Sequence, residues 1–206
     1  MILAVIYLLC SFYLIRKWRV FRFENISNIQ LSLAFVIKLF GAFILYYVYT
    51  EIYRERQTAD IFKFYDDSLA LTQVFFDSPS DFIKIIIGIY EDHFLMDYFI
   101  NMNHWDNSYE SVITNESRVV IKICAIINLI SLNNYVVNVI IFTMLGYIGI
   151  ILTIRSLALL YPSKYVIHLL WSVVLFPSIF IWSAGVLKEP LICLLYTSPS
   201  PRDEAL

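Results

Sequence analysis

Glycine is scarce in this chain, with five residues among 206. Loops that cradle a phosphate or a dinucleotide need closely spaced glycines, because the backbone must approach the ligand. The sequence contains no P-loop, no dinucleotide fingerprint and no Gly-x-Ser-x-Gly nucleophile elbow. These absences argue against the nucleotide-binding and hydrolase classes that carry such signatures.

Cysteine and histidine are also few, with three residues of each. The cysteines have no metal-ligand spacing, and Cys10 and Cys124 fall in apolar runs, so we interpret both as small hydrophobic residues. His93 and His104 share a segment with several aspartates but lack a tight His-x-x-His spacing. We interpret them as solvated loop residues and name no metal ligand among them.

Charge is low overall: 16% of the residues are charged, against about a quarter in a soluble domain. Hydrophobic residues make up 60% of the chain, and the mean hydropathy is +0.71. These values indicate an all-α, polytopic membrane protein. The net charge of −2 argues against a nucleic-acid partner.

The acids that are present gather in one polar segment, residues 51–118. It holds 13 of the 17 acidic residues against five Lys/Arg, for a formal charge of −8. Cytoplasmic loops of membrane proteins collect Lys and Arg, so we expect this segment on the extracytoplasmic side of the membrane.

Apolar runs on both sides of this segment predict four transmembrane helices, over about 1–15, 29–50, 134–154 and 165–183. The run 119–132 is too short to cross and is expected to be interfacial or re-entrant. Pro177 should kink the last span. Lys38 inside the second span has two interpretations, a side chain snorkelling to the headgroups or a cation that meets a lipid phosphate.

The predicted organisation has four parts. Residues 1–50 form two spans with a basic cytoplasmic loop, and 51–133 form the acidic extracytoplasmic loop. Residues 134–192 form two further spans and a Lys-Glu turn. Residues 193–206 are expected to be an artefactual tail, because Cys193–Asp203 resembles a translated sequencing-adapter read-through. The chain is then expected to be an N-terminal fragment.

Two amphipathic helices are expected within the loop, lying on the membrane surface or against the transmembrane helices. Ser78 to Ser80 should separate them, with Ser80 capping the second. The apolar stripe of the first is Ile61, Tyr65, Leu69, Thr72 and Phe76. The apolar stripe of the second is Phe82, Ile85, Ile86, Ile89, His93 and Met96.

Three short motifs carry a resemblance. They are Thr58-Ala59-Asp60 with Tyr65, then Ile130-Ser131-Leu132-Asn133-Asn134-Tyr135 leading to Gly146 and Gly149, and then Phe176-Pro177-Ser178-Ile179-Phe180-Ile181-Trp182-Ser183-Ala184-Gly185 followed by Lys188-Glu189. Over about residues 45–192 the chain resembles the GT-C superfamily of membrane glycosyltransferases, which use polyprenyl-phosphate sugars, and related polysaccharide polymerases.

The resemblance implies that an acidic residue of the first extracytoplasmic loop is the base or a metal ligand. Asp60 matches it, with Asp66 and Asp67 as rivals, and a divalent metal stays open. Lys188-Glu189 departs from the expected Lys-Asp pair, which leaves the role of Glu189 open. Four spans are too few for a complete enzyme of this type.

The chemistry follows from the reaction itself. A carboxylate must take the proton of the acceptor hydroxyl, and a cation must stabilise the departing phosphate. We predict Asp60 for the first role and Lys188, with Glu189 beside it, for the second. The residues predicted to bind substrate are Tyr65, Asp66, Asp67 and Trp182. The competing interpretations are a solvated helix face for the aspartates and an interfacial anchor pair for Lys188-Glu189.

The predicted function is therefore a membrane glycosyltransferase in cell-envelope polysaccharide or glycoconjugate synthesis. Its expected partners are membrane lipid and a polyprenyl-phosphate-linked sugar donor. The alternative is a non-catalytic transport or assembly subunit. Transport proteins place polar groups near the bilayer midplane, and these spans offer little there besides Lys38 and Asn138.

Overall fold

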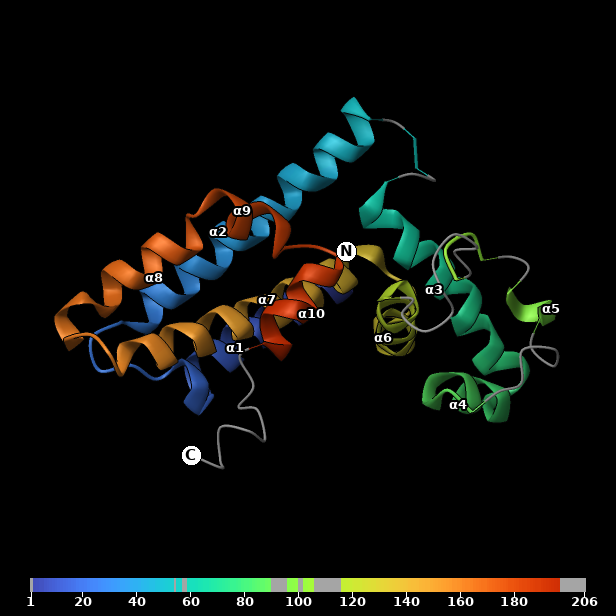
Figure 1. The fold of residues 1–206 in the computed structure, drawn as a ribbon, viewed down its shortest axis with the longest axis horizontal. Helices are drawn as coiled ribbons and strands as arrows, with labels where there is room; N and C mark the ends of the chain where they lie inside the picture. The colour runs from blue at the N-terminus through green and yellow to red at the C-terminus, as the bar shows by residue number, and fades with distance from the viewer. Residues whose placement is uncertain are drawn as a thin grey trace. The chain divides into compact units, whose positions relative to one another are not determined.

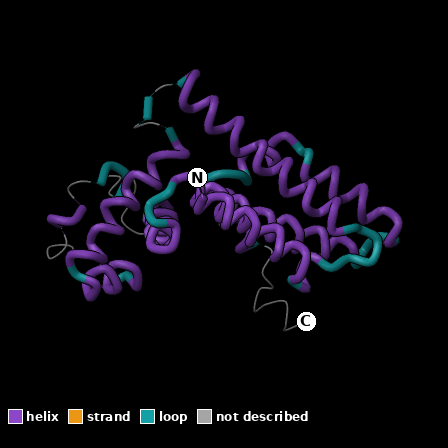
Figure 2. Tube along the Cα trace, turned by 180° about the vertical axis from the view of Figure 1, so that it is seen from behind, coloured by secondary structure: helices purple, strands orange, loops and turns teal. Residues whose placement is uncertain are grey.

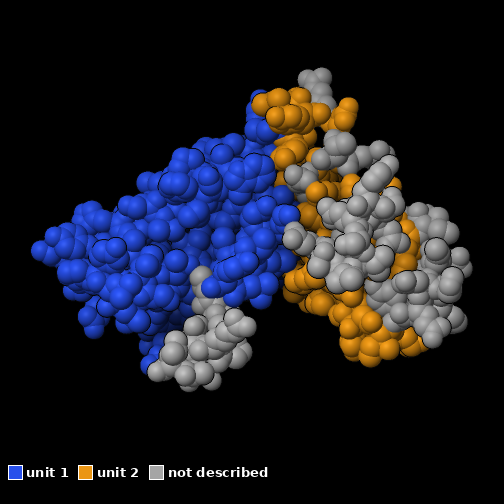
Figure 3. Space-filling view, in the orientation of Figure 1, with its two compact units in different colours: residues 1–48, 139–206 blue, residues 49–138 orange. Residues whose placement is uncertain are grey.

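A computed structural model of the chain describes residues 2–53, 55–56, 59–89, 96–99, 102–105 and 116–196. Every regular element within these ranges is helical, which agrees with the predicted all-α class (Figures 1 and 2). The chain divides into two compact units, which are described separately (Figure 3). We call residues 1–48 with 139–206 the terminal unit and residues 49–138 the central unit.

The terminal unit contains α1 (Ile2–Lys17), α2 (Asn28–Tyr47) and most of α7 (Tyr135–Ala158), followed by three short helices. These are α8 (Val166–Val174), α9 (Pro177–Trp182) and α10 (Lys188–Leu195). A capping box starts α2: the Ser27 hydroxyl accepts the Gln30 amide hydrogen, and the Gln30 side chain accepts that of Ser27. A π-helical turn, Val48–Ile52, continues α2.

Two helices within the described residues are long and apolar enough to cross a membrane. They are α2 with its π-turn, Asn28–Ile52, and α7. The predicted first span corresponds to α1, which has only 16 residues. The predicted fourth span is interrupted: Phe176 is extended and Pro177 begins a new helix, so the expected kink is a complete break between α8 and α9.

Aromatic rings form the centre of the terminal unit. The Tyr147 ring lies 5.6 Å from both Phe21 and Phe35, centroid to centroid. Its hydroxyl donates to the Leu31 carbonyl at 2.8 Å, so the one polar atom of this ring is satisfied inside the core. The cluster ties α7 to α2 and to the short 3-10 helix Arg19–Phe21.

The central unit is built on α3 (Asp60–Asp77), which packs along α6 (Glu116–Ser131) and against α4 (Pro79–Ile87) and the four-residue α5 (Met96–Phe99). The predicted first helix of the loop is α3. The predicted short run 119–132 is α6, a 16-residue helix.

The predicted second helix begins and ends differently. Ser78, not Ser80, is its N-cap residue, because Pro79 occupies the first helical position, where a missing N–H costs nothing. Gly88 ends the helix in the left-handed conformation with φ +85°, and the Gly88 and Ile89 amides bond back to Lys84. The prediction of one helix with a stripe from Phe82 to Met96 is therefore wrong at Ile89, which follows the end of α4, and at Met96, which begins α5. Its member His93 lies outside the described residues.

Candidate functional site

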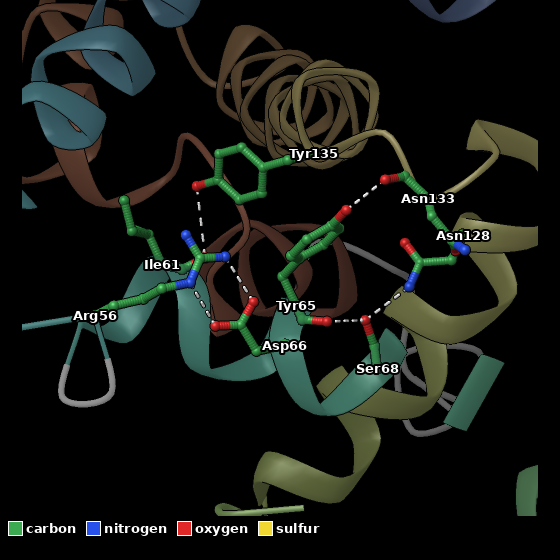
Figure 4. A network of polar contacts seen from close by, with 8 residues as sticks. All are labelled: Arg56, Ile61, Tyr65, Asp66, Ser68, Asn128, Asn133 and Tyr135. Atoms are coloured by element: carbon green, nitrogen blue, oxygen red, sulfur yellow. Dashed lines mark hydrogen bonds and ion pairs between the residues drawn. The ribbon is translucent and has the colours of Figure 1, made fainter. Parts of the chain in front are cut away.

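An ion pair joins Asp66 of α3 to Arg56, which precedes the helix. The Asp66 carboxylate accepts two hydrogen bonds from the Arg56 guanidinium, at 2.9 Å to Nε and 2.7 Å to Nη2 (Figure 4). The guanidinium carbon also lies 4.3 Å from the Phe62 ring centroid. The Arg56 and Asp66 side chains are 58% and 35% exposed, so this pair adds little stability. It does hold the segment before α3 against the helix.

Tyr65 connects α3 to the turn between α6 and α7. Its hydroxyl donates to the Asn133 carbonyl, and its ring lies edge-on to Tyr135 at 5.1 Å between centroids (Figure 4). Leu132 and Asn133 both have positive φ, +53° and +57°, a conformation that costs a residue such as leucine about 1–2 kcal/mol. The Tyr65 bond therefore stabilises a strained turn, and burial raises the pKa of the phenol.

Asp67 is buried, with 2% of its surface exposed. One carboxylate oxygen accepts the Asn103 amide at 3.0 Å and the other accepts the His104 amide at 2.7 Å. Burial raises the pKa of this carboxyl, and the two amides oppose that shift in part. The solvated-face interpretation is wrong for Asp67, because the carboxylate holds the backbone of 103–104 against α3.

A chain of buried polar side chains, which the sequence analysis missed, links α3 to α6 and α7. The Asn128 amide nitrogen donates to the Ser68 hydroxyl at 2.8 Å and to the Thr72 hydroxyl at 3.2 Å. The Asn138 amide nitrogen donates to the Asn128 oxygen and lies 3.6 Å from the Cys124 sulfur. Burial raises the pKa of the Cys124 thiol to about 12, so it is an inert part of the interior, as predicted from its apolar run.

The sequence contained a signal for this set of linked polar side chains. Ser68 and Thr72 are four residues apart, as are Cys124 and Asn128, so each pair lies on one helix face. Small polar residues at this spacing can form bonds between helices.

In the terminal unit, Lys38 has no exposed surface. Its amine donates to the carbonyls of Ile179 and Phe180 and, at 2.6 Å, to the Ser183 hydroxyl. Both sequence interpretations, a snorkelling side chain and a lipid-phosphate contact, are therefore replaced. The Ile179 carbonyl also accepts the Ser183 amide and hydroxyl, so Lys38 adds a further donor at the end of α9, where the last carbonyls of a helix have few partners.

The turn between α9 and α10 is buried from Ser183 to Leu187. The Gly185 amide, at φ +86°, donates to the Thr143 hydroxyl at 3.1 Å. The turn reaches this depth because α7 offers no side chain at Gly146: a Cβ there would lie 2.6 Å from the Ser183 carbonyl oxygen.

Three predicted site residues flank this buried turn. Trp182 precedes it and is 42% exposed, and Lys188 follows it and is exposed. Glu189 is half-buried, and its Oε2 atom is buried without a hydrogen-bond partner among the described residues. A buried carboxylate oxygen is costly unless a donor or a cation reaches it, so Glu189 is the unsatisfied group of this segment.

The structure groups the predicted residues in two sets. Asp60, Tyr65, Asp66 and Asp67 lie on α3 of the central unit, where Asp60 is the first helical residue. Trp182, Lys188 and Glu189 lie in the terminal unit. Since each unit is described by itself, the pairing of Asp60 with Lys188 stays a prediction. Within the described ranges, no three His, Cys, Asp or Glu side chains are grouped as metal ligands.

An open, mostly apolar pocket of about 430 Å³ lies elsewhere in the terminal unit, beside His168. Its lining residues are Tyr161, Tyr165, His168, Leu169 and Ser172. The imidazole is 6.4 Å from the Tyr165 ring, centroid to centroid.

Comparisons of the chain with protein-family models, curated proteins and solved structures find no match. The GT-C resemblance therefore rests on the sequence motifs alone.

Proposed function

We propose that this chain is part of a membrane glycosyltransferase that uses a polyprenyl-phosphate-linked sugar donor in cell-envelope polysaccharide or glycoconjugate synthesis. The observation that carries the proposal is that two of the candidate aspartates of α3 are engaged in contacts within the protein. Asp66 is paired with Arg56, and Asp67 holds the amides of Asn103 and His104. Two rivals therefore have structural roles, which favours Asp60 as the residue with a chemical one.

In this proposal Asp60 takes the proton from the acceptor hydroxyl while the oxygen of that hydroxyl bonds to the anomeric carbon of the donor sugar. The bond between that carbon and the phosphate oxygen breaks, and the lipid phosphate leaves with the electron pair. The Lys188 ammonium stabilises the negative charge of the departing phosphate. Its exposed position at the start of α10, after a buried turn, supports this role.

The test is transfer of a radiolabelled sugar from a polyprenyl-phosphate donor by the complete protein in membranes. We expect Asp60→Asn to lower transfer by about 100-fold or more, as loss of a general base does. Asp77→Asn, at the exposed end of the same helix, is the matched control and should stay within a few-fold of wild type, because the exposed Asp77 side chain accepts its hydrogen bond from the neighbouring Gln73 side chain of α3. Wild-type activity in Asp60→Asn, with normal membrane insertion, would remove Asp60 from the mechanism.

A transport or assembly role is the second candidate, and the buried Lys38 favours it. Transporters use interrupted helices whose free carbonyls meet a cation in the membrane interior. The Lys38 amine at the end of α9, after the break at Pro177, has this form. In the same radiolabel assay, a transporter would leave the sugar on its donor in both wild type and Asp60→Asn.

A further inference from the structure

The helix α4 has two apolar faces, and only one is covered. Phe82 and Ile85 are buried in the central unit, at 5% and 0% exposure. Ile83 and Ile87, one turn apart on the other side, are 54% and 64% exposed, and Ile89 just beyond the helix is 67% exposed. A solvated helix normally has polar residues on its outer face. Among the described residues, these exposed isoleucines therefore form an apolar surface without a packing partner, which we call the α4 patch.

Positive charge lies at one end of the α4 patch. The Lys122 amine of α6 is 3.9 Å from the place where a Cβ on Gly88 would be, between Ile87 and Ile89. Lys84 lies within the patch and is 52% exposed, in an ion pair with Asp81 at 2.9 Å. Lys84 is one of only five Lys/Arg in the segment 51–118, and Lys122 follows just beyond it, so two of the few cations of this region lie beside the exposed isoleucines.

Aromatic packing supports the Lys122 position. Trp105 is buried, with 1% exposure, and the Lys122 amine lies 5.9 Å from its ring centroid. The Arg118 guanidinium, one turn earlier on α6, lies 5.4 Å from the same ring and donates to the Trp105 carbonyl at 2.9 Å. The indole thus has two cations of α6 beside it.

The chain on both sides of the central unit is apolar. The helix Asn28–Ile52 leads into it and α7 leads out of it, and both are long and apolar enough to cross a membrane. The chain therefore enters and leaves this unit from helices suited to a bilayer. An apolar surface with adjacent cations, in a unit that lies between two such helices, fits the phospholipid interface. There the isoleucines can enter the boundary of the acyl chains and the amines can contact the phosphates.

We propose that α4 lies in the surface of a phospholipid bilayer through Ile83, Ile87 and Ile89, with the Lys122 amine at the lipid phosphates. This surface is independent of the proposed sugar transfer. The amphipathic sequence of α4 allows two positions, on the membrane surface or against the transmembrane helices, and the proposal chooses the first. It also gives a function to the isoleucines that are not buried in the core of the central unit.

The test measures nitroxide accessibility in the full chain, reconstituted in vesicles of phosphatidylcholine and phosphatidylglycerol. Labels are placed by Ile87→Cys and, as a control, by Gln73→Cys at an exposed polar position of α3. Cys10 and Cys193 are replaced by serine, whereas the buried Cys124 is left in place. The ratio of oxygen to water-soluble nickel-chelate accessibility should be about fivefold or more higher at position 87 than at position 73.

Charge variants separate headgroup contact from burial alone. Lys122→Glu should bring the ratio at position 87 close to that at position 73, and Lys122→Arg should leave it unchanged. Equal nickel accessibility at both positions would overturn the proposal. A label at position 87 that is shielded from both oxygen and the nickel chelate, in detergent as well as in vesicles, would also overturn the proposal. Protein would then cover the α4 patch. Insensitivity to Lys122→Glu would overturn the assignment of the phosphate contact.

Discussion

The two units satisfy their buried polar groups in different ways. In the terminal unit, Lys38 donates to backbone carbonyls at the end of α9, and the turn after it packs against Gly146. In the central unit, side chains bond to side chains: Asn128 donates to Ser68 and Thr72, and Asn138 donates to Asn128. Both units therefore contain buried polar groups. The terminal unit buries a cation against backbone carbonyls, whereas the central unit buries the Asp67 carboxylate against backbone amides and joins its helices through side-chain amides and hydroxyls.

The difference follows the break in the chain at Pro177. The six residues of α9 follow this break, and Lys38 of α2 adds a donor to the carbonyl of Ile179, which already accepts the Ser183 amide, and to that of Phe180. The helices α3 and α6, with 18 and 16 residues, satisfy most of their backbone internally, and their polar side chains are left to pair with each other. The interrupted span therefore receives a donor from α2, whereas the continuous helices α3 and α6 pair their polar side chains with each other.

The largest expected effect comes from reversing the charge in the terminal unit. Lys38→Glu would place a carboxylate against the carbonyls of Ile179 and Phe180, and we expect a loss of about 3–5 kcal/mol in the free energy of unfolding. Thermal unfolding in detergent, with yield of folded protein, measures it. Lys38→Met keeps the volume without the charge and is the control. A Met variant as stable as wild type would show that the amine does not hold α9.

A smaller effect is expected in the central unit. Asp67→Ala leaves the amides of Asn103 and His104 without their acceptor, and we expect a loss of about 2 kcal/mol. Asp66→Ala, the adjacent residue, removes only a half-exposed ion pair and should cost less than about 1 kcal/mol. The same unfolding measurement compares the two. Equal losses would contradict the distinction between the buried and the half-exposed aspartate.

The smallest effect is a dependence on pH. Because burial raises the pKa of Asp67, the folded protein binds this proton more tightly than the unfolded chain. Its contribution to stability is then fully present below the ordinary pKa of about 3.9 and is lost as pH rises through the raised value. The stability difference between wild type and Asp67→Asn should therefore fall as pH rises from about 3 to 7. A difference that grows with pH would mean that the two amides outweigh burial.

The fold class and several helices of the central unit follow from local sequence. The apolar stripe beginning at Ile61 predicted α3, and the Ser-Pro-Ser sequence predicted where it stops. The end of α4 was missed although Gly88 signalled it, because the apolar pattern continues past the glycine. Phe76, a member of the predicted stripe, is 66% exposed, so periodicity identified the helix better than its buried face.

The candidate site was harder to predict. Asp66 and Asp67 are adjacent and chemically identical, yet one is half-exposed beside Arg56 and the other is buried under the backbone of 103–104. No local pattern distinguishes them, because the partners are 10 and about 36 residues away in sequence. The same holds for Lys38, whose acceptors are more than 140 residues away.

The sequence by itself determined the helical class, the apolar helices α2 and α7 and a departure from a straight helix at Pro177, because hydropathy, periodicity and proline act over a few residues. Only the tertiary structure decided which polar groups are buried and what they bind. Burying a charge such as Lys38 or a carboxylate such as Asp67 is favourable only when distant segments supply its partners, and that supply depends on how the helices pack.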